Sequence, residues 1–218
     1  MAGFSYAGSI YKWKDAEGRI HFGDRAPIDT TEMKHVKVQD SFTLPALDIQ
    51  IINPIIRRFD VRGTSRYELH QSMMENGPLN KVTQVRHWGT CSWSIGWDFT
   101  YLTDKKRCQI DALTLKLSTE IHLPHWVNRA SAPYELQRKW DSFERAVRTH
   151  EDGHRDNGLA AIYDLAGKLR TLAPQEDCAT LNREISDLGA RVTEKYRLRD
   201  KAYDQSIING ETRRSAFW

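Results

Sequence analysis

Apolar and polar positions alternate along much of the chain before Pro133, as is typical of β-strands. Three segments show this alternation or a short apolar run: 50–61, 81–88 and 93–102. The clearest alternation runs from Leu113 to Leu123 and stops at Pro124, which predicts a half-buried strand or a ribbon of two strands. We expect that strand to form the edge of a sheet.

After Pro133 the apolar positions recur every three or four residues, which is the spacing of one helix face. The stripe consists of Leu136, Trp140, Phe143, Val147, His150, His154, Gly158, Ala161, Leu165, Leu169 and Leu172. A second long helix is predicted from about Cys178 to Gln205. A short helix is predicted at 67–75, because Asn76-Gly77-Pro78 would end it.

The N-terminal residues predict a separate small module. Two aromatic-rich alternating runs between Ile10 and Phe22 surround a turn that ends in glycine, which predicts a hairpin, and 35–38 could add a third strand. We therefore expect an α+β fold in two parts. Residues 1–48 form a β-hairpin module with a linker, and 49–218 form a mixed or antiparallel sheet packed on two long helices.

Composition narrows the function classes. The 218 residues are 39% hydrophobic and carry a net charge of only +3, so nucleic acid is not an expected partner. No apolar run approaches the roughly 20 residues of a membrane helix, and the N-terminus lacks the features of an intact signal peptide. The three cysteines share no CxxC spacing, which argues against a cysteine zinc knuckle, and spacing alone selects no disulfide pair.

The sequence His150-Glu151-Asp152-Gly153-His154 fits the HExxH pattern of zinc peptidases. Histidines four residues apart project from the same side of a helix and can bind one ion at about 2.0–2.1 Å. Glu151 is rotated about 100° around the helix, where it could take a proton from water and pass it to the leaving amine. A chance match is the alternative, although two histidines on an apolar stripe require a reason.

A catalytic zinc ion needs a third protein ligand, and spacing leaves its identity open. We expect the second long helix to provide it. Asp200 and Asp204 lie on or near its inner face, Glu184 and Glu194 lie further from that face, and Asn209 follows the helix. An exposed acidic residue on a helix is common without any metal, so none of these stands out from the residues alone.

Several landmarks resemble a known family. They are Phe59-Asp60-Val61-Arg62-Gly63-Thr64, Asn76-Gly77-Pro78, Cys108, Leu123-Pro124-His125-Trp126, Trp140 ahead of the HExxH segment, and Cys178 with Leu181-Asn182. Over about Phe59 to Ala216 the chain resembles a bacterial family of unknown function, described as predicted secreted zinc-dependent proteases.

The resemblance implies that His150 and His154 bind zinc, that Glu151 is the general base, and that Cys108 pairs with Cys178, which leaves Cys91 free. The family's last helix ends in tyrosine-aspartate, matched here by Tyr203 and Asp204, and a histidine-glycine pair follows, matched by Asn209-Gly210. If that histidine is the family's third ligand, an amide replaces it here and is a poor zinc ligand. We favour Asp204 as the third ligand, and Tyr203 is a candidate oxyanion donor.

The N-terminal module has its own resemblance. Tyr11-Lys12-Trp13, Asp15, Gly18, His21-Phe22, Asp24 and Pro27 are similar to a small domain of unknown function found after the signal peptide of bacterial envelope proteins. A generic hairpin would look much the same. The resemblance implies export to the periplasm or beyond, which agrees with a disulfide.

We therefore expect a zinc metallopeptidase of the bacterial envelope, whose protein or peptide substrate adds as a strand to Leu113–Leu123. The first alternative is a catalytically impaired relative that binds an envelope protein partner through the N-terminal hairpin, and Asn209 favours it. The second is a cytosolic protein whose HExxH segment is incidental.

Overall fold

The computed structural model describes residues 10–14, 20–23, 33–36, 44–81, 83–104 and 107–209, with side chains from 44 to 206. The chain divides into two compact units, Met1–Leu44 and Pro45–Trp218, and each is described by itself. The division falls a few residues before the predicted boundary, because strand β4 (Ala46–Ile51) already belongs to the second unit.

The first unit contains a three-stranded antiparallel sheet. Its strands are β1 (Ile10–Lys14), β2 (Ile20–Gly23) and β3 (Met33–Val36), in the order β2-β1-β3. The predicted hairpin is therefore confirmed, and the third strand lies slightly before its predicted position.

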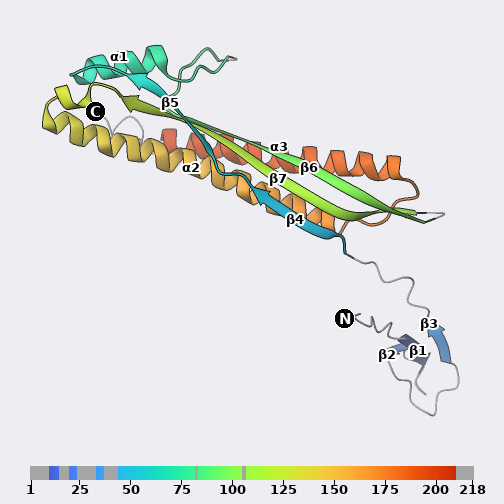
Figure 1. Cartoon of the computed structure of the whole chain (residues 1–218). Coiled ribbons are helices and arrows are strands. Elements are labelled where there is room, and N and C mark those ends of the chain that lie inside the picture. Colours follow the sequence, from blue (N-terminus) through green and yellow to red (C-terminus); the bar gives the residue numbers. More distant parts are fainter. Residues whose placement is uncertain are drawn as a thin grey trace, which may run out of the picture. The chain divides into compact units, whose positions relative to one another are not determined.

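The second unit is built on a mixed sheet whose central strand is β7 (Arg107–Trp126). Strand β6 (Thr90–Asp104) pairs antiparallel along one side of β7. On the other side β4 pairs parallel with its first half, and β5 (Ile55–Val61) pairs parallel with its second half (Figure 1). The prediction that Leu113–Leu123 forms a sheet edge is wrong, because alternation reports the buried face and not the number of neighbouring strands.

Two other strand predictions need correction. Segment 50–61 is not one strand, because β4 ends at Ile51 and β5 begins at Ile55, on either side of Asn53-Pro54, and proline has no N–H for a ladder. Segment 81–88 forms a loop in its described residues, with a single bridge between Leu79 and Arg86.

In the part of the chain that the structure describes, three α-helices accompany the sheet, and all three were predicted. Helix α1 (Arg66–Asn76) is capped at its N-terminus by Ser65, whose side chain and that of Glu68 form a capping box. Helix α2 (Tyr134–Arg170) follows a short 3₁₀ turn at Arg129–Ser131, and helix α3 (Cys178–Asn209) follows α2. None of the described helices has the length and apolar character that a membrane span requires.

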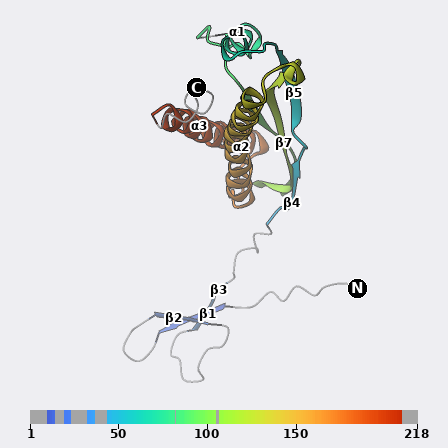
Figure 2. The ribbon, with the colours of Figure 1, turned by 90° about the vertical axis from the view of Figure 1, so that its left-hand side faces the viewer.

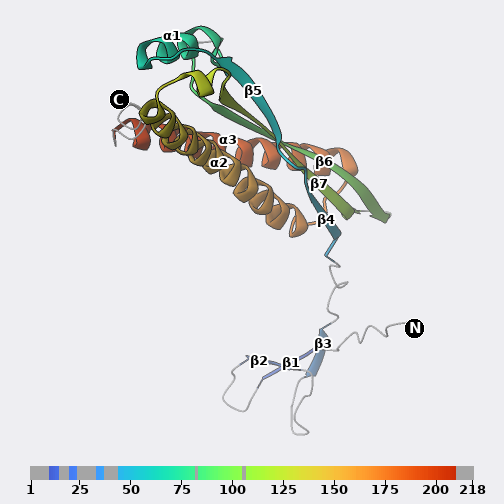
Figure 3. The same cartoon turned by 60° about the vertical axis from the view of Figure 1, so that its left-hand side comes forward.

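Helices α2 and α3 both lie on one face of the sheet. Helix α2 packs against β6 and β7, and α3 packs on α2 and crosses it at an angle (Figures 2 and 3). A disulfide between Cys108 and Cys178 joins the start of β7 to the start of α3, and Cys91 is free, as the resemblance implied.

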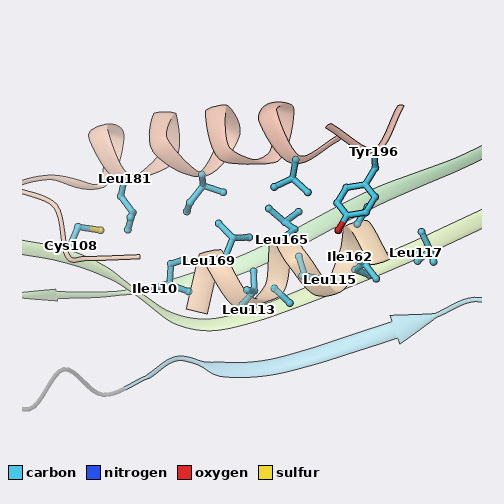
Figure 4. Close-up of a cluster of buried hydrophobic side chains, with 14 residues drawn as sticks. Cys108, Ile110, Leu113, Leu115, Leu117, Ile162, Leu165, Leu169, Leu181 and Tyr196 are labelled. Carbon is cyan, nitrogen blue, oxygen red and sulfur yellow. The ribbon is translucent and has the colours of Figure 1, made fainter. Parts of the chain in front are cut away.

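The apolar side chains form two clusters that meet on α2. One cluster holds Leu113, Leu115 and Leu117 of β7 together with the second half of α2 and the inner face of α3 (Figure 4). The other joins the first half of α2 to α1, β5 and the end of β7. On α2, Val147 belongs to the second cluster and Ala161 to the first, and the buried polar residues between them separate the two clusters.

Candidate metal centre

Helix α2 buries three polar side chains in the stretch between the two apolar clusters. His150 is 4% exposed, Glu151 2% and His154 7%, whereas polar side chains on a helix usually face water. Removing polar groups from water is costly unless they find partners. The partners of the histidines come from α3, which crosses α2 at this point.

Three ligand atoms converge where the helices meet. The Nε2 atoms of His150 and His154 lie 3.0 Å apart, and Asp204 Oδ1 lies 3.0 Å from the first and 3.1 Å from the second. The structure thus brings Asp204, the favoured third ligand, to the two histidines of the HExxH segment. These three residues can hold one metal ion.

The three ligand atoms form a triangle that fits a small divalent cation. Atoms that bind one tetrahedral ion at about 2.0 Å lie about 3.3 Å from one another, close to the separations found here. Three lone-pair acceptors this close repel each other unless a proton or a cation lies among them. Either His150 and His154 share protons with Asp204, or an ion takes the place of those protons.

Asp200 lies behind His154 and orients it. Its Oδ1 lies 3.0 Å from His154 Nδ1 and accepts a hydrogen bond from Asn157 Nδ2 at 2.7 Å, and its Oδ2 accepts one from Trp93 Nε1 at 2.8 Å. Because the Nδ1–H of neutral His154 donates to the carboxylate of Asp200, Nε2 carries no proton and keeps its lone pair for an ion. Asp200 was one of the alternative ligands, and it has this orienting position instead.

The remaining candidate ligands lie elsewhere. Glu194 lines a separate cavity between α3 and β6, and Glu184 accepts a hydrogen bond from Gln175 Nε2. Asn209 is the last residue of α3, and its side chain lies outside the described residues.

Tyr203 supports the imidazole of His150 from α3. The two rings stack with centroids 4.9 Å apart and an interplanar angle of 13°. The tyrosine ring lies over Gly153, where a Cβ atom would come within 2.6 Å of Cζ. The ring of Tyr203 therefore holds the imidazole of His150 in place, and its predicted contact with an oxyanion stays a prediction.

Glu151 faces an open cavity of about 390 Å³ that His150, His154 and Asp204 also line. Burial raises the pKa of Glu151 to about 7, although a positive charge on His154 opposes the shift and the backbone N–H of Cys91 donates to the carboxylate. Gly89 makes the close approach possible, because a Cβ there would lie 2.9 Å from Glu151 Oε1. The carboxyl group can therefore gain and lose a proton near neutral pH.

His154 holds its proton strongly when no metal is present. Burial alone would lower its pKa, but hydrogen bonds and the charges of Asp200 and Asp204 outweigh burial and raise the pKa to about 10. A divalent cation would compete with this proton for Nε2.

Comparison with known families finds a match for each of the two parts of the chain. Residues 56–210 match the family described as bacterial protein of unknown function (DUF922). The chain belongs to this family. Because the match covers both α2 and α3, the candidate metal centre lies within the family's domain. Residues 2–46 match a domain of unknown function, DUF4124.

Both resemblances seen in the sequence are thus confirmed as domains of unknown function, and neither description states an activity. Comparison with curated proteins and with solved structures found no match.

Proposed function

We propose that the chain is a zinc-dependent peptidase of the bacterial envelope. The observation that carries the proposal is the convergence of His150 Nε2, His154 Nε2 and Asp204 Oδ1 within 3.0–3.1 Å of one another, in a cavity that Glu151 also lines. Three protein ligands beside an open cavity are typical of catalytic zinc sites, whereas structural sites have four protein ligands.

Zinc is the ion that suits this donor set. Two imidazole nitrogens and one carboxylate oxygen match a tetrahedral site, whereas magnesium and calcium prefer oxygen ligands alone. When bound, zinc would act as a Lewis acid that polarises a carbonyl group and lowers the pKa of water.

Glu151 serves as the general base and then as the acid. It accepts a proton from the attacking water and delivers it to the leaving amine, and a pKa of about 7 suits both transfers. The N–H of Cys91 holds the carboxylate in place, and Gly89 leaves room for it. Tyr203 positions His150, and Asp200 positions His154.

An extended peptide would bind along β6. Among the described strands β6 pairs with β7 alone, and Gly89, Thr90 and Cys91 at its start line the cavity beside Glu151. A peptide that adds to this edge is recognised mainly through its backbone, so its carbonyl groups would pass in front of the histidines. Strand β6 thus takes the role predicted for Leu113–Leu123.

The location in the envelope rests on the disulfide and on the N-terminal domain. The Cys108–Cys178 bond is expected to persist in an oxidising compartment such as the periplasm. The alternative of an impaired, non-catalytic relative is less well supported, because Asp204 provides a third ligand atom whatever Asn209 contributes.

A matched pair of variants tests the activity. Protein purified without a histidine tag should contain about one zinc ion per chain, and His150→Ala should lose it. Glu151→Gln should keep the zinc and lose hydrolysis of reduced, labelled casein by about 100-fold or more. Glu135→Gln at the exposed start of α2 is the control and should behave as the wild type. Equal hydrolysis by Glu151→Gln, or no bound zinc at micromolar concentration, would overturn the proposal.

A further inference from the structure

The edge of β6 carries backbone groups that no described strand uses. The N–H of Cys91 donates to the Glu151 carboxylate and therefore points away from β7. Residues of an antiparallel strand direct their backbone groups alternately to one side and the other. Trp93, Ile95 and Trp97 consequently present their N–H and C=O groups to the same free edge as Cys91.

A second cavity, of about 480 Å³, lies between this edge and α3. Trp93, Ser94 and Ile95 all line it, although neighbouring side chains of a strand point to opposite faces, so the cavity borders the backbone edge itself. Its floor includes the indole of Trp97, which packs so closely on α3 that a Cβ atom at Gly189 would lie 2.6 Å from Trp97 Cη2.

Trp93 links the second cavity to the candidate metal centre. Trp93 lines the second cavity, and Trp93 Nε1 donates to Asp200, which lines the first cavity. Along an extended chain Cys91 and Ile95 are separated by about 13 Å, at about 3.3 Å per residue. A peptide paired with β6 in front of Glu151 would therefore reach the second cavity with its third or fourth residue from the bond that is cut.

We propose that the cavity between β6 and α3 is a substrate subsite for a large apolar side chain of an extended peptide, three or four residues from the cleaved bond. Two indoles, those of Trp93 and Trp97, provide the apolar contact, and Glu194 and Arg197 on α3 form a polar rim. The substrate class is then unfolded or extended protein segments with such a residue. The inference rests on the proposed peptidase function.

The test uses the zinc-loaded full chain and a pool of unstructured 14-residue peptides, whose products are identified by mass spectrometry. Cleaved bonds should have Leu, Phe or Trp at the third or fourth residue on one side. In a peptide pair that differs only there, kcat/KM for Leu should exceed that for Asp by about tenfold or more.

Variants on α3 test whether the preference for Leu over Asp arises in the second cavity. Ala190→Trp fills the cavity and should reduce the Leu-to-Asp ratio to about one, and Thr193→Glu, which places a charge there, should do the same. Ala179→Trp, an identical change at an exposed position near the start of α3, is the control and should keep the ratio. A wild-type ratio near one, or an unchanged ratio in both cavity variants, would overturn the subsite.

The two proposals fail separately. If the wild type cuts no peptide while zinc is bound, the peptidase function fails. The subsite is then judged by fluorescence anisotropy with the same Leu and Asp peptides carrying fluorescein. Tighter binding of the Leu peptide that Ala190→Trp abolishes supports the subsite, and equal binding of the two peptides contradicts it.

Discussion

Gly153 offers a direct test of how α2 and α3 build the metal centre. It lies between His150 and His154 on α2, and the ring of Tyr203 occupies the space that a side chain at Gly153 would take. A Cβ atom there would lie 2.6 Å from Tyr203 Cζ and 2.7 Å from Cε1, which is too close for the present arrangement. In Gly153→Ala the tyrosine ring, and with it the stacking on His150, must therefore shift.

Gly167 on the same helix is the control position, because it shows how much a glycine-to-alanine change alone alters the free energy of unfolding. A Cβ atom at Gly167 would meet nothing within 4 Å, so Gly167→Ala should raise the free energy of unfolding by about 1 kcal/mol through helix propensity. Gly153→Ala has the same propensity gain, but overpacking costs about 1–3 kcal/mol. Loss of the support for His150 should also weaken zinc binding about tenfold, as is common when a ligand loses its orienting contact.

Two measurements decide this prediction. Urea unfolding of the metal-free variants gives the difference in unfolding free energy, and competition with a chromophoric chelator gives the zinc affinity. We expect Gly153→Ala to be less stable than Gly167→Ala and to bind zinc more weakly than the wild type. If the two variants match in both stability and affinity, the contact between Tyr203 and His150 does not hold the site.

Three further predictions concern the surroundings of the ligands. Gly89→Ala should slow the hydrolysis of casein about 10- to 100-fold with zinc content unchanged, because the added Cβ would displace Glu151. Gly96→Ala in β6, where a Cβ would meet nothing within 4 Å, is the control and should hydrolyse casein at the wild-type rate. Equal rates for the two variants would contradict this prediction. Asp200→Asn should weaken zinc binding about tenfold in calorimetry, because His154 loses a charged partner, and an unchanged affinity would count against that role. The pKa of His154 is raised from 6.5 to about 10, so its proton stabilises the metal-free fold below pH 6.5 and that contribution is lost as the pH rises to about 10. The pKa of Glu151 is raised from 4.5 to about 7, so its ionisation also removes stability as the pH rises. The Tm of the metal-free protein should thus decrease as the pH is raised from about 5 to about 9. Over the same range the increase in Tm that zinc causes should become larger. A zinc-induced increase in Tm that does not change with pH would contradict the competition between proton and metal.

The histidine half of the centre could be predicted because it is local. The spacing of His150 and His154 and their place on the apolar stripe follow from the helical period, which fixes the side on which they project. The buried state of Glu151 was less predictable, since it depends on Gly89 and Cys91 from the start of a strand far away in the sequence.

The α3 half could not be assigned from the sequence alone. Asp200 and Asp204 lie on the same helix one turn apart, and their roles depend on where α3 crosses α2. Trp93 has no sequence signal for its bond to Asp200, because the two residues meet only through the packing of β6 against α3. The same holds for the sheet, because alternation predicted β7 but not which strand lies at the edge, and at 81–88 it predicted a strand where the described residues form a loop.

X-ray absorption at the zinc edge of the loaded protein tests the metal centre most directly. If His150, His154 and Asp204 hold zinc as we propose, the loaded protein should contain about one zinc ion per chain, with nitrogen and oxygen scatterers at about 2.0–2.1 Å, an outer-shell signal from two imidazoles, and no sulfur. Asp204→Ala should lose one oxygen scatterer and most of the affinity. A sulfur scatterer at about 2.3 Å, which Cys91 could provide, or an unchanged spectrum in Asp204→Ala would contradict this assignment of the ligands.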